Sequence, residues 1–154
     1  MHTFSISSDL AAAPEVVWRH VTDMDGVNSE LTPLLRMTVS PGLESARLDR
    51  LPVGRRAGRS WLLLFGFLPV DFDDLTIAEY GPGHRFLEQS TMLTQSRWEH
   101  ERTVAAIAGG CRVVDRLAWR GRVAPLGALY RLAVPVLFRH RHARLRRLFS
   151  VPPR

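Results

Sequence analysis

Four ionisable side chains stand in neighbouring segments of the chain, and their types fit acid–base chemistry or recognition of a polar ligand group. His100 and Arg102 are two positions apart in one apolar segment. Asp115 lies in the next such segment and Glu88 in the preceding one. A histidine oriented by a carboxylate can act as a general base. An arginine with two acids can instead form a buried ion-pair network.

The Gly109-Gly110 pair predicts how two of these segments meet. Both glycines accept positive φ, and Gly-Gly is a favoured two-residue loop between antiparallel strands. With both glycines in the loop, strands at 97–107 and 111–121 pair so that Arg102 opposes Leu117. His100 then opposes Trp119, and Val104 opposes Asp115.

Charge decides which face of this hairpin points inward. Glu99 opposes Arg120 in the predicted register, on a face that is charged at most positions and must be solvated. The other face therefore points inward, and a slip of one residue would bury the charged one. Extending the meander backward places Glu88 opposite Arg102, so that two acids, an arginine and a histidine converge inside the sheet.

This inward cluster has three interpretations, which the residues alone leave open. Glu88, Arg102 and Asp115 can satisfy one another as a structural brace, since buried charges are costly unless paired. They can orient the polar end of an otherwise apolar ligand. His100 can be a catalytic acid or base. We expect no metal, because no short ligand motif is present, and no cofactor.

The elements that must position the cluster follow from hydrophobic periodicity and turn residues. A strand at 2–8 precedes a helix that begins at Pro14, a residue suited to the first helical turn. The remaining elements are a short helix at 27–31, strands at 34–39, 61–68, 70–79, 85–93, 97–107 and 111–121, and a long helix at 123–149. A turn at Leu68-Pro69 separates two of the strands. Pro135 is expected to kink or divide the last helix.

Composition favours one globular domain over residues 1–154. The chain is 45% hydrophobic and 23% charged, with a net charge of +6 in which every basic residue is arginine. Cys111 is the only cysteine, which excludes an intrachain disulfide. No secretory signal is visible, and the apolar tract 123–138 is shorter than the ~20 residues of a membrane span. We therefore expect a cytoplasmic protein.

Several motifs, in this order and spacing, resemble the START-like or Bet v 1-like superfamily, also called SRPBCC. They are Ala13-Pro14-Glu15-Val16-Val17-Trp18, Gly83-His84-Arg85-Phe86-Leu87-Glu88, Trp98-Glu99-His100, Gly110-Cys111-Arg112-Val113-Val114-Asp115 and Ala124-Pro125-Leu126-Gly127. The resemblance covers nearly the whole chain. Related sequences often carry a second histidine where this chain has Arg102.

The resemblance implies an α+β helix-grip fold. A curved antiparallel sheet of about six or seven strands would wrap around the long C-terminal helix, with two short helices after the first strand. Members bind lipids, sterols, polyketides and other hydrophobic molecules, and some are cyclases or hydrolases. Fold alone does not decide among these activities.

We therefore expect a carrier or sensor that holds a small hydrophobic or lipid-like molecule between the sheet and the last helix. A non-enzymatic binding protein is favoured over an enzyme. The alternative is a polyketide cyclase or hydrolase with His100 as its acid/base. The expected ligand-binding residues are Trp61, Phe65, Phe86, Glu88, Trp98, His100, Arg102, Asp115, Leu117, Trp119, Tyr130, Val134 and Phe138.

The densest run of positive charge lies near the C-terminus. Its arginines are Arg139, Arg141, Arg144, Arg146 and Arg147. Cations near a helix C-terminus are favourable, so simple solvation explains them. They could also contact an anionic membrane surface. Nucleic-acid binding is the weaker alternative, because no recognition motif accompanies the charge. The oligomeric state is left as monomer or homodimer.

Overall fold

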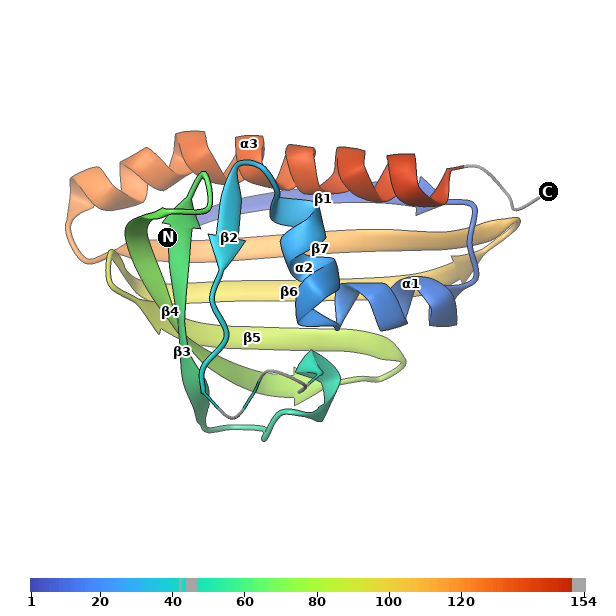
Figure 1. Ribbon diagram of the computed structural model, residues 1–154, viewed down its shortest axis with the longest axis horizontal. Coiled ribbons are helices and arrows are strands. Elements are labelled where there is room, and N and C mark those ends of the chain that lie inside the picture. Colours follow the sequence, from blue (N-terminus) through green and yellow to red (C-terminus); the bar gives the residue numbers. More distant parts are fainter. Residues whose placement is uncertain (42, 44–46, 151–154) are drawn as a thin grey trace.

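A seven-stranded antiparallel sheet curves around one long helix in the computed structural model, which describes residues 1–41, 43 and 47–150 (Figure 1). The strand order is β1-β7-β6-β5-β4-β3-β2. The elements are β1 (His2–Leu10), α1 (Pro14–Val21), α2 (Met24–Leu31), β2 (Leu35–Met37), the 3-10 helix η1 (Leu48–Arg50), β3 (Arg56–Leu64), β4 (Leu68–Tyr80), β5 (His84–Met92), β6 (Gln95–Ile107), β7 (Gly110–Gly121) and α3 (Ala124–Phe149).

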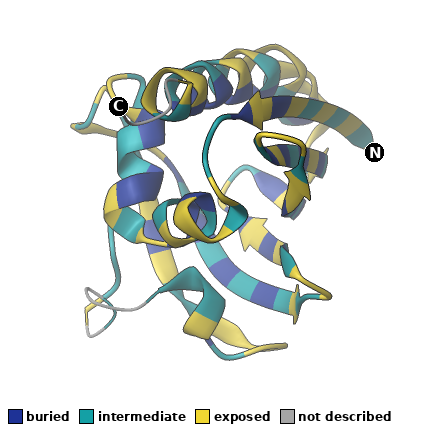
Figure 2. Ribbon diagram, turned by 90° about the vertical axis from the view of Figure 1, so that its right-hand side faces the viewer, coloured by how far each residue is buried: buried dark blue, intermediate teal, exposed yellow. Residues whose placement is uncertain are grey.

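The α+β helix-grip architecture predicted from the sequence is confirmed, including the two short helices after the first strand. Pro14 begins α1, where its missing N–H is no loss, and Glu15 complements the helix dipole. The Asp23 side chain accepts a hydrogen bond from the backbone N–H of Asp25 at 3.0 Å and so caps α2. Buried and more exposed residues alternate along the strands, which leaves one face of the sheet for the interior (Figure 2).

The turn between β3 and β4 lies elsewhere than predicted, and Pro135 does not divide the last helix. The turn between β3 and β4 is formed by residues 65–67, and Leu68-Pro69 belongs to β4. Phe65 and Gly66 have φ of 54° and 86°, so the chain reverses in the left-handed region three residues earlier than expected. Pro135 lies inside α3, which continues as one helix from Ala124 to Phe149.

The β6–β7 register is two residues away from the predicted one. Ile107 pairs with Gly110, so the loop is Ala108-Gly109, and Arg102 pairs directly with Asp115. Gly110 is in the strand because β1 passes against it: a Cβ at this position would lie 1.8 Å from the carbonyl oxygen of Leu10. A shift of two residues keeps every side chain on its predicted face.

The β5–β6 register differs by the same two residues. Glu88 pairs with His100, and Phe86 pairs with Arg102. The predicted Glu88–Arg102 contact is therefore wrong, while the prediction that both side chains point inward is correct, since each is buried.

Two apolar clusters join α3 to the sheet. One lies beneath the C-terminal end of α3 and α1 and includes Val17, Val113 and Leu145. The other lies beneath the first half of α3 and includes Trp119 and Phe138. In the part of the chain that the structure describes, no helix has the length and apolar character to cross a membrane.

Candidate functional site

A cavity of about 640 Å³ lies between the inner face of the sheet and helices α2 and α3. This volume is in the range of small-molecule sites. Apolar side chains form most of its wall. Its polar lining residues are Ser60, Asp73, Glu88, Thr94, His100, Tyr130 and Arg141.

Arg102 lies fully buried behind this wall and joins three elements. Its Nε and Nη2 each donate to Asp115 at 2.7 Å, and its Nη1 donates to Glu30 of α2 at 2.9 Å. Burial alone would raise the pKa of Asp115, but Arg102 and then His100 hold that pKa well below its usual range. Burial likewise opposes the charge on Arg102, and Asp115 and Glu30 overcome it and raise the pKa of the guanidinium. The arrangement is an ion pair with satisfied hydrogen bonds.

Two histidines complete the coordination of Asp115. His100 Nε2 lies 2.7 Å from Asp115 Oδ1, and His142 Nε2 of α3 lies 2.7 Å from Oδ2. An ionised carboxylate only accepts hydrogen bonds, so both Nε2 atoms carry hydrogen. The Nδ1 atom of His100 is then left on the other side of the ring, 3.9 Å from Glu88 Oε2. His142 Nδ1 is 2.8 Å from the hydroxyl of Ser8.

Arg141 enters the interior from α3 and does not reach the surface predicted for it. Its Nε donates to Glu30 at 3.2 Å, and its guanidinium stands 4.9 Å from the centroid of Phe138. Burial is the main cause that lowers the pKa of Arg141, and the neighbouring charge of Arg102 adds to it. Arg141 is thus part of the internal network.

Asp73 of β4 is a site residue that the sequence reasoning missed. It is 4% exposed, lines the cavity, and its Oδ1 has no hydrogen-bond partner. Burial raises the pKa of Asp73 well above its usual range, and the charge of Glu88 and a hydrogen bond with it raise it further. The signal was present in the alternation: Asp71 and Asp73 share a face with Leu75 and Ile77, which are buried.

Tyr130 connects α3 to the opposite wall of the cavity. Its hydroxyl donates to Asp71 of β4 and accepts from Thr94 at 3.2 Å. The backbone N–H of Thr94 also donates to Asp71 at 3.2 Å. Burial and then the hydrogen bond with Asp71 raise the pKa of Tyr130. The phenol is therefore held neutral and in place at the wall.

The structure brings eight of the residues expected at the ligand to the cavity wall. These are Phe65, Phe86, Glu88, Trp98, His100, Tyr130, Val134 and Phe138.

The other five do not line the cavity. Arg102 and Asp115 lie behind His100, and Leu117 and Trp119 pack beneath α3. Trp61 is on the outer face of β3, 40% exposed and 5.3 Å from the ring of Phe72. Both faces of that segment are apolar in sequence, so alternation could not fix its direction.

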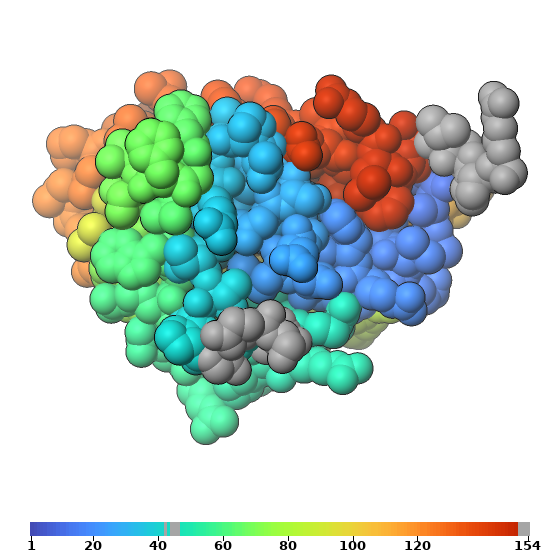
Figure 3. All heavy atoms as spheres, in the orientation of Figure 1, coloured from blue at the N-terminus to red at the C-terminus, as the bar shows by residue number. Residues whose placement is uncertain are grey.

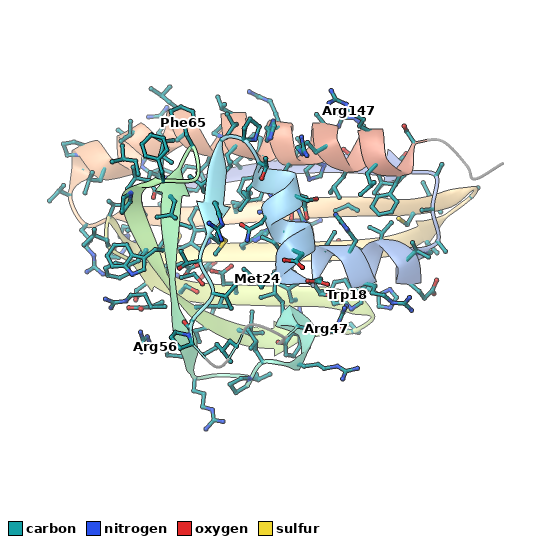
Figure 4. The ribbon with its side chains drawn as sticks, viewed as in Figure 1. Trp18, Met24, Arg47, Arg56, Phe65 and Arg147 are labelled. Atoms are coloured by element: carbon teal, nitrogen blue, oxygen red, sulfur yellow. The ribbon has the colours of Figure 1, made fainter. Side chains whose placement is uncertain are left out.

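An exposed apolar rim surrounds one side of the cavity. Phe65 and Val70 come from the β3–β4 hairpin, and Leu129, Leu132 and Val136 come from α3. All five line the cavity, yet each is more than one third exposed; Leu132 is 73% exposed. In the view of Figure 3 the tip of the hairpin overlaps the first half of α3, and Figure 4 labels Phe65 on that tip.

The C-terminal arginines are less free than their sequence indicates. Arg144 donates to the carbonyl of Ser29 at 2.6 Å, and Arg146 donates to the hydroxyl of Ser8 at 2.8 Å. Arg139 and Arg147 are exposed, and Arg147 points away from the fold in Figure 4. Among residues 1–41, 43 and 47–150, no group of three or more His, Cys, Asp or Glu side chains is placed to hold a metal ion.

Solved structures with the same architecture define the class of this protein. Protein CV1439 from Chromobacterium violaceum superposes with a TM-score of 0.72 at 17% identity, covering 99% of this chain and 100% of that one. A START superfamily protein from Mycobacterium smegmatis gives 0.63 at 11% identity over 96% and 99% of the two chains. Ara h 8.0201 gives 0.56 at 10% identity over 94% and 97%. The chain therefore has a START/Bet v 1-like fold.

A family model identifies the chain more closely. Residues 8–149 match the model described as Domain of unknown function (DUF8410), and the chain belongs to that family. A comparison with curated protein sequences gave no match.

The network around Arg102 generates a stability prediction. Asp115→Asn should lower the free energy of unfolding by about 3–5 kcal/mol at pH 7, because Arg102 would keep its buried charge without its main partner. Because the native pKa of Asp115 is lowered, the ionised carboxylate stabilises the fold at any pH above its unfolded-state pKa. This contribution is lost as pH falls through the native pKa. Urea titrations should therefore show the difference in free energy of unfolding between wild type and Asp115→Asn becoming smaller at acid pH.

Asp9→Asn is the control, because Asp9 forms an exposed pair with Arg112, and it should change the free energy of unfolding little. An Asp115→Asn protein as stable as wild type at pH 7 contradicts this account.

Asp73 should behave in the opposite way. Its native pKa is raised, so its contribution to stability is complete below the unfolded-state pKa and is lost as pH rises through the native value. Asp73→Asn should thus raise the melting temperature at pH 8 and leave it nearly unchanged at pH 4.

The adjacent residue supplies the control for Asp73. Asp74 lies on the outer face, and its pKa is lowered chiefly by a hydrogen bond from Arg59. Asp74→Asn should therefore bring no gain at pH 8. Equal thermal shifts for the two variants at both pH values would show that the burial of Asp73 has no energetic consequence.

Proposed function

We propose that this protein binds a small hydrophobic molecule in the cavity between its sheet and helix α3. The observation that carries the proposal is the cavity itself, about 640 Å³ with a mainly apolar wall and a few polar groups gathered on it. An apolar guest would remove this wall from water, at roughly 25 cal/mol per Å² of buried apolar surface. The START/Bet v 1-like fold supports the proposal, because it is a ligand-binding fold.

The exposed apolar rim fits the route by which such a guest would enter. Phe65 and Leu132 belong to different elements, so separation of the β3–β4 hairpin from α3 would widen the opening without breaking a strand pair. Exposed apolar surface rimmed by polar residues commonly marks a ligand-binding groove or an interaction site.

Acid–base catalysis by His100 is the second candidate function. The observation that favours it is the orientation of the ring, with Nε2 on Asp115 and Nδ1 on the side of the cavity. Against it, Asp115 already neutralises Arg102 through two hydrogen bonds, so little of its charge is left to stabilise an imidazolium. Binding without chemistry therefore ranks first.

The second candidate has a direct test. Any molecule extracted from the purified protein should be incubated with wild type and with His100→Gln, and its mass should be followed. If catalysis by His100 is real, a new product forms only with wild type. Identical mass spectra from both proteins eliminate it.

Blocking the cavity tests the leading proposal. Leu62 lines the cavity from β3, and its neighbour Leu63 does not. Leu62→Trp should weaken binding of the neutral apolar dye Nile red by about 1.4 kcal/mol or more, which is tenfold in Kd, because the indole fills the dye's volume. Leu63→Trp adds the same bulk outside the cavity and should bind as wild type does. Equal binding by all three proteins, or by none, sinks the proposal.

A further inference from the structure

The buried charges divide into a balanced group and an unbalanced one. The balanced group contains two acids, Glu30 and Asp115, and two arginines, Arg102 and Arg141. Each arginine donates to an acid of the group. Their formal charges cancel. This group therefore needs no charged ligand to balance it.

The unbalanced group consists of Asp73 and Glu88 on the adjacent strands β4 and β5. Both are buried and both line the cavity. Neither forms an ion pair with an arginine in the described part of the chain. Among the described residues, the ion-pair contact that either acid makes is with His100, whose Nδ1 is 3.9 Å from Glu88 Oε2. Two acids thus face at most one positive charge.

The hydrogen bonds of this acid pair are also incomplete. Glu88 Oε1 accepts from the hydroxyl of Ser90 at 2.9 Å, and Asp73 forms a hydrogen bond with Glu88 but leaves its Oδ1 without a partner. An unpaired buried acceptor destabilises the protein because it has lost its water without gaining a donor. A donor supplied by a ligand would remove that cost, and a charged donor would do more.

We propose that Asp73 and Glu88 form the polar end of the cavity and bind a protonated amine carried by an otherwise apolar ligand. This inference rests on the proposed function, because it assigns a chemical class to the same occupant. An ammonium group offers three donors and one positive charge, which matches an unpartnered oxygen and an uncompensated carboxylate. Burial and then the charge of Glu88 raise the pKa of Asp73, and an ammonium group beside the two acids would lower that pKa again.

The aromatic rings next to the acids fit the same ligand. Phe86 and Phe138 each meet the ring of His100 edge to face, with centroids 5.4 and 5.2 Å away, and both line the cavity. Aromatic faces attract cations, and more strongly where water is excluded. A carboxylate ligand at this end would face like charge from Asp73 and Glu88.

Arg141 is the group that could favour the opposite sign. It lines the cavity, but its guanidinium is bonded to Glu30 and held near the Phe138 ring. An anion that took Arg141 would have to compete with Glu30. The net charge of +6 belongs to the whole chain and does not describe this end of the cavity.

The test compares three probes with one chain length and different head groups. Decylamine, decan-1-ol and decanoic acid should be titrated into the full protein at pH 7 by calorimetry, below their micelle concentrations. We expect the amine to bind about tenfold more tightly than the alcohol, and the acid most weakly. Asp73→Asn with Glu88→Gln should remove the preference for the amine and keep the affinity for the alcohol. The outer-face variant Asp74→Asn should keep the preference.

The outcomes separate the two proposals. Equal binding of the three probes, or tightest binding of the acid, overturns the amine assignment and leaves the hydrophobic cavity intact. Binding of none of them overturns both. Should the double variant fail to fold, Asp73→Asn alone carries the test, and an unchanged amine preference in it counts against the proposal.

Discussion

The contact on which the interior depends is the double hydrogen bond from Arg102 to Asp115, extended by a third from Arg102 to Glu30. Charges this deep are costly to desolvate, and only a nearly complete set of partners offsets the cost. Arg102 stands on β6 and its partners come from β7 and α2, so satisfying one guanidinium fixes a helix against the sheet. His142 then brings α3 to the same carboxylate. Polar pairing therefore sets relative positions that apolar packing alone would leave less defined.

The hollow beneath α3 follows from where that helix is attached. His142 holds its C-terminal half to Asp115, and Tyr130 holds its first half to Asp71. Trp119 adds a hydrogen bond to the carbonyl of Gly127 near the start of the helix, at 3.2 Å. Val134 lies between these attachments and faces the cavity. A helix fixed at both ends can span a space that its central side chains do not fill.

How far the sequence predicts this molecule is clearest at the β6–β7 hairpin. Charge alternation identified the inward face correctly, because the charged face cannot be buried. The predicted pairing within that face differs from the observed one by two residues. Gly109-Gly110 is typical of a two-residue loop, but Gly110 lies in the strand because β1 approaches it too closely for a side chain. The error did not move His100 or Asp115 to the other face, but it assigned Arg102 the wrong partner.

The partners that the sequence could not supply are those from distant elements. Glu30 sits on an amphipathic helix, and Arg141 and His142 sit in a run that reads as a solvated basic end. Only the three-dimensional path of α3 turns two of those basic residues inward. Asp73 differs, because the alternation of β4 already placed it on the buried face. An acid on the otherwise apolar face of a strand is therefore a signal that this sequence carries.

The distribution of charge gives the interior its chemical character. The two buried arginines, Arg102 and Arg141, form ion pairs with Glu30 and Asp115. Arg144 and Arg146 donate hydrogen bonds to Ser29 and Ser8. A strongly basic protein thereby keeps a cavity whose uncompensated groups are acids. The surface charge that attracts a ligand and the buried charge that selects it therefore act separately. Salt screens exposed charges and screens buried ones far less. Because Asp73 and Glu88 are buried beside each other at the cavity wall, the sign of charge selected there is set by those two carboxyls and their few neighbours rather than by the net charge of the chain.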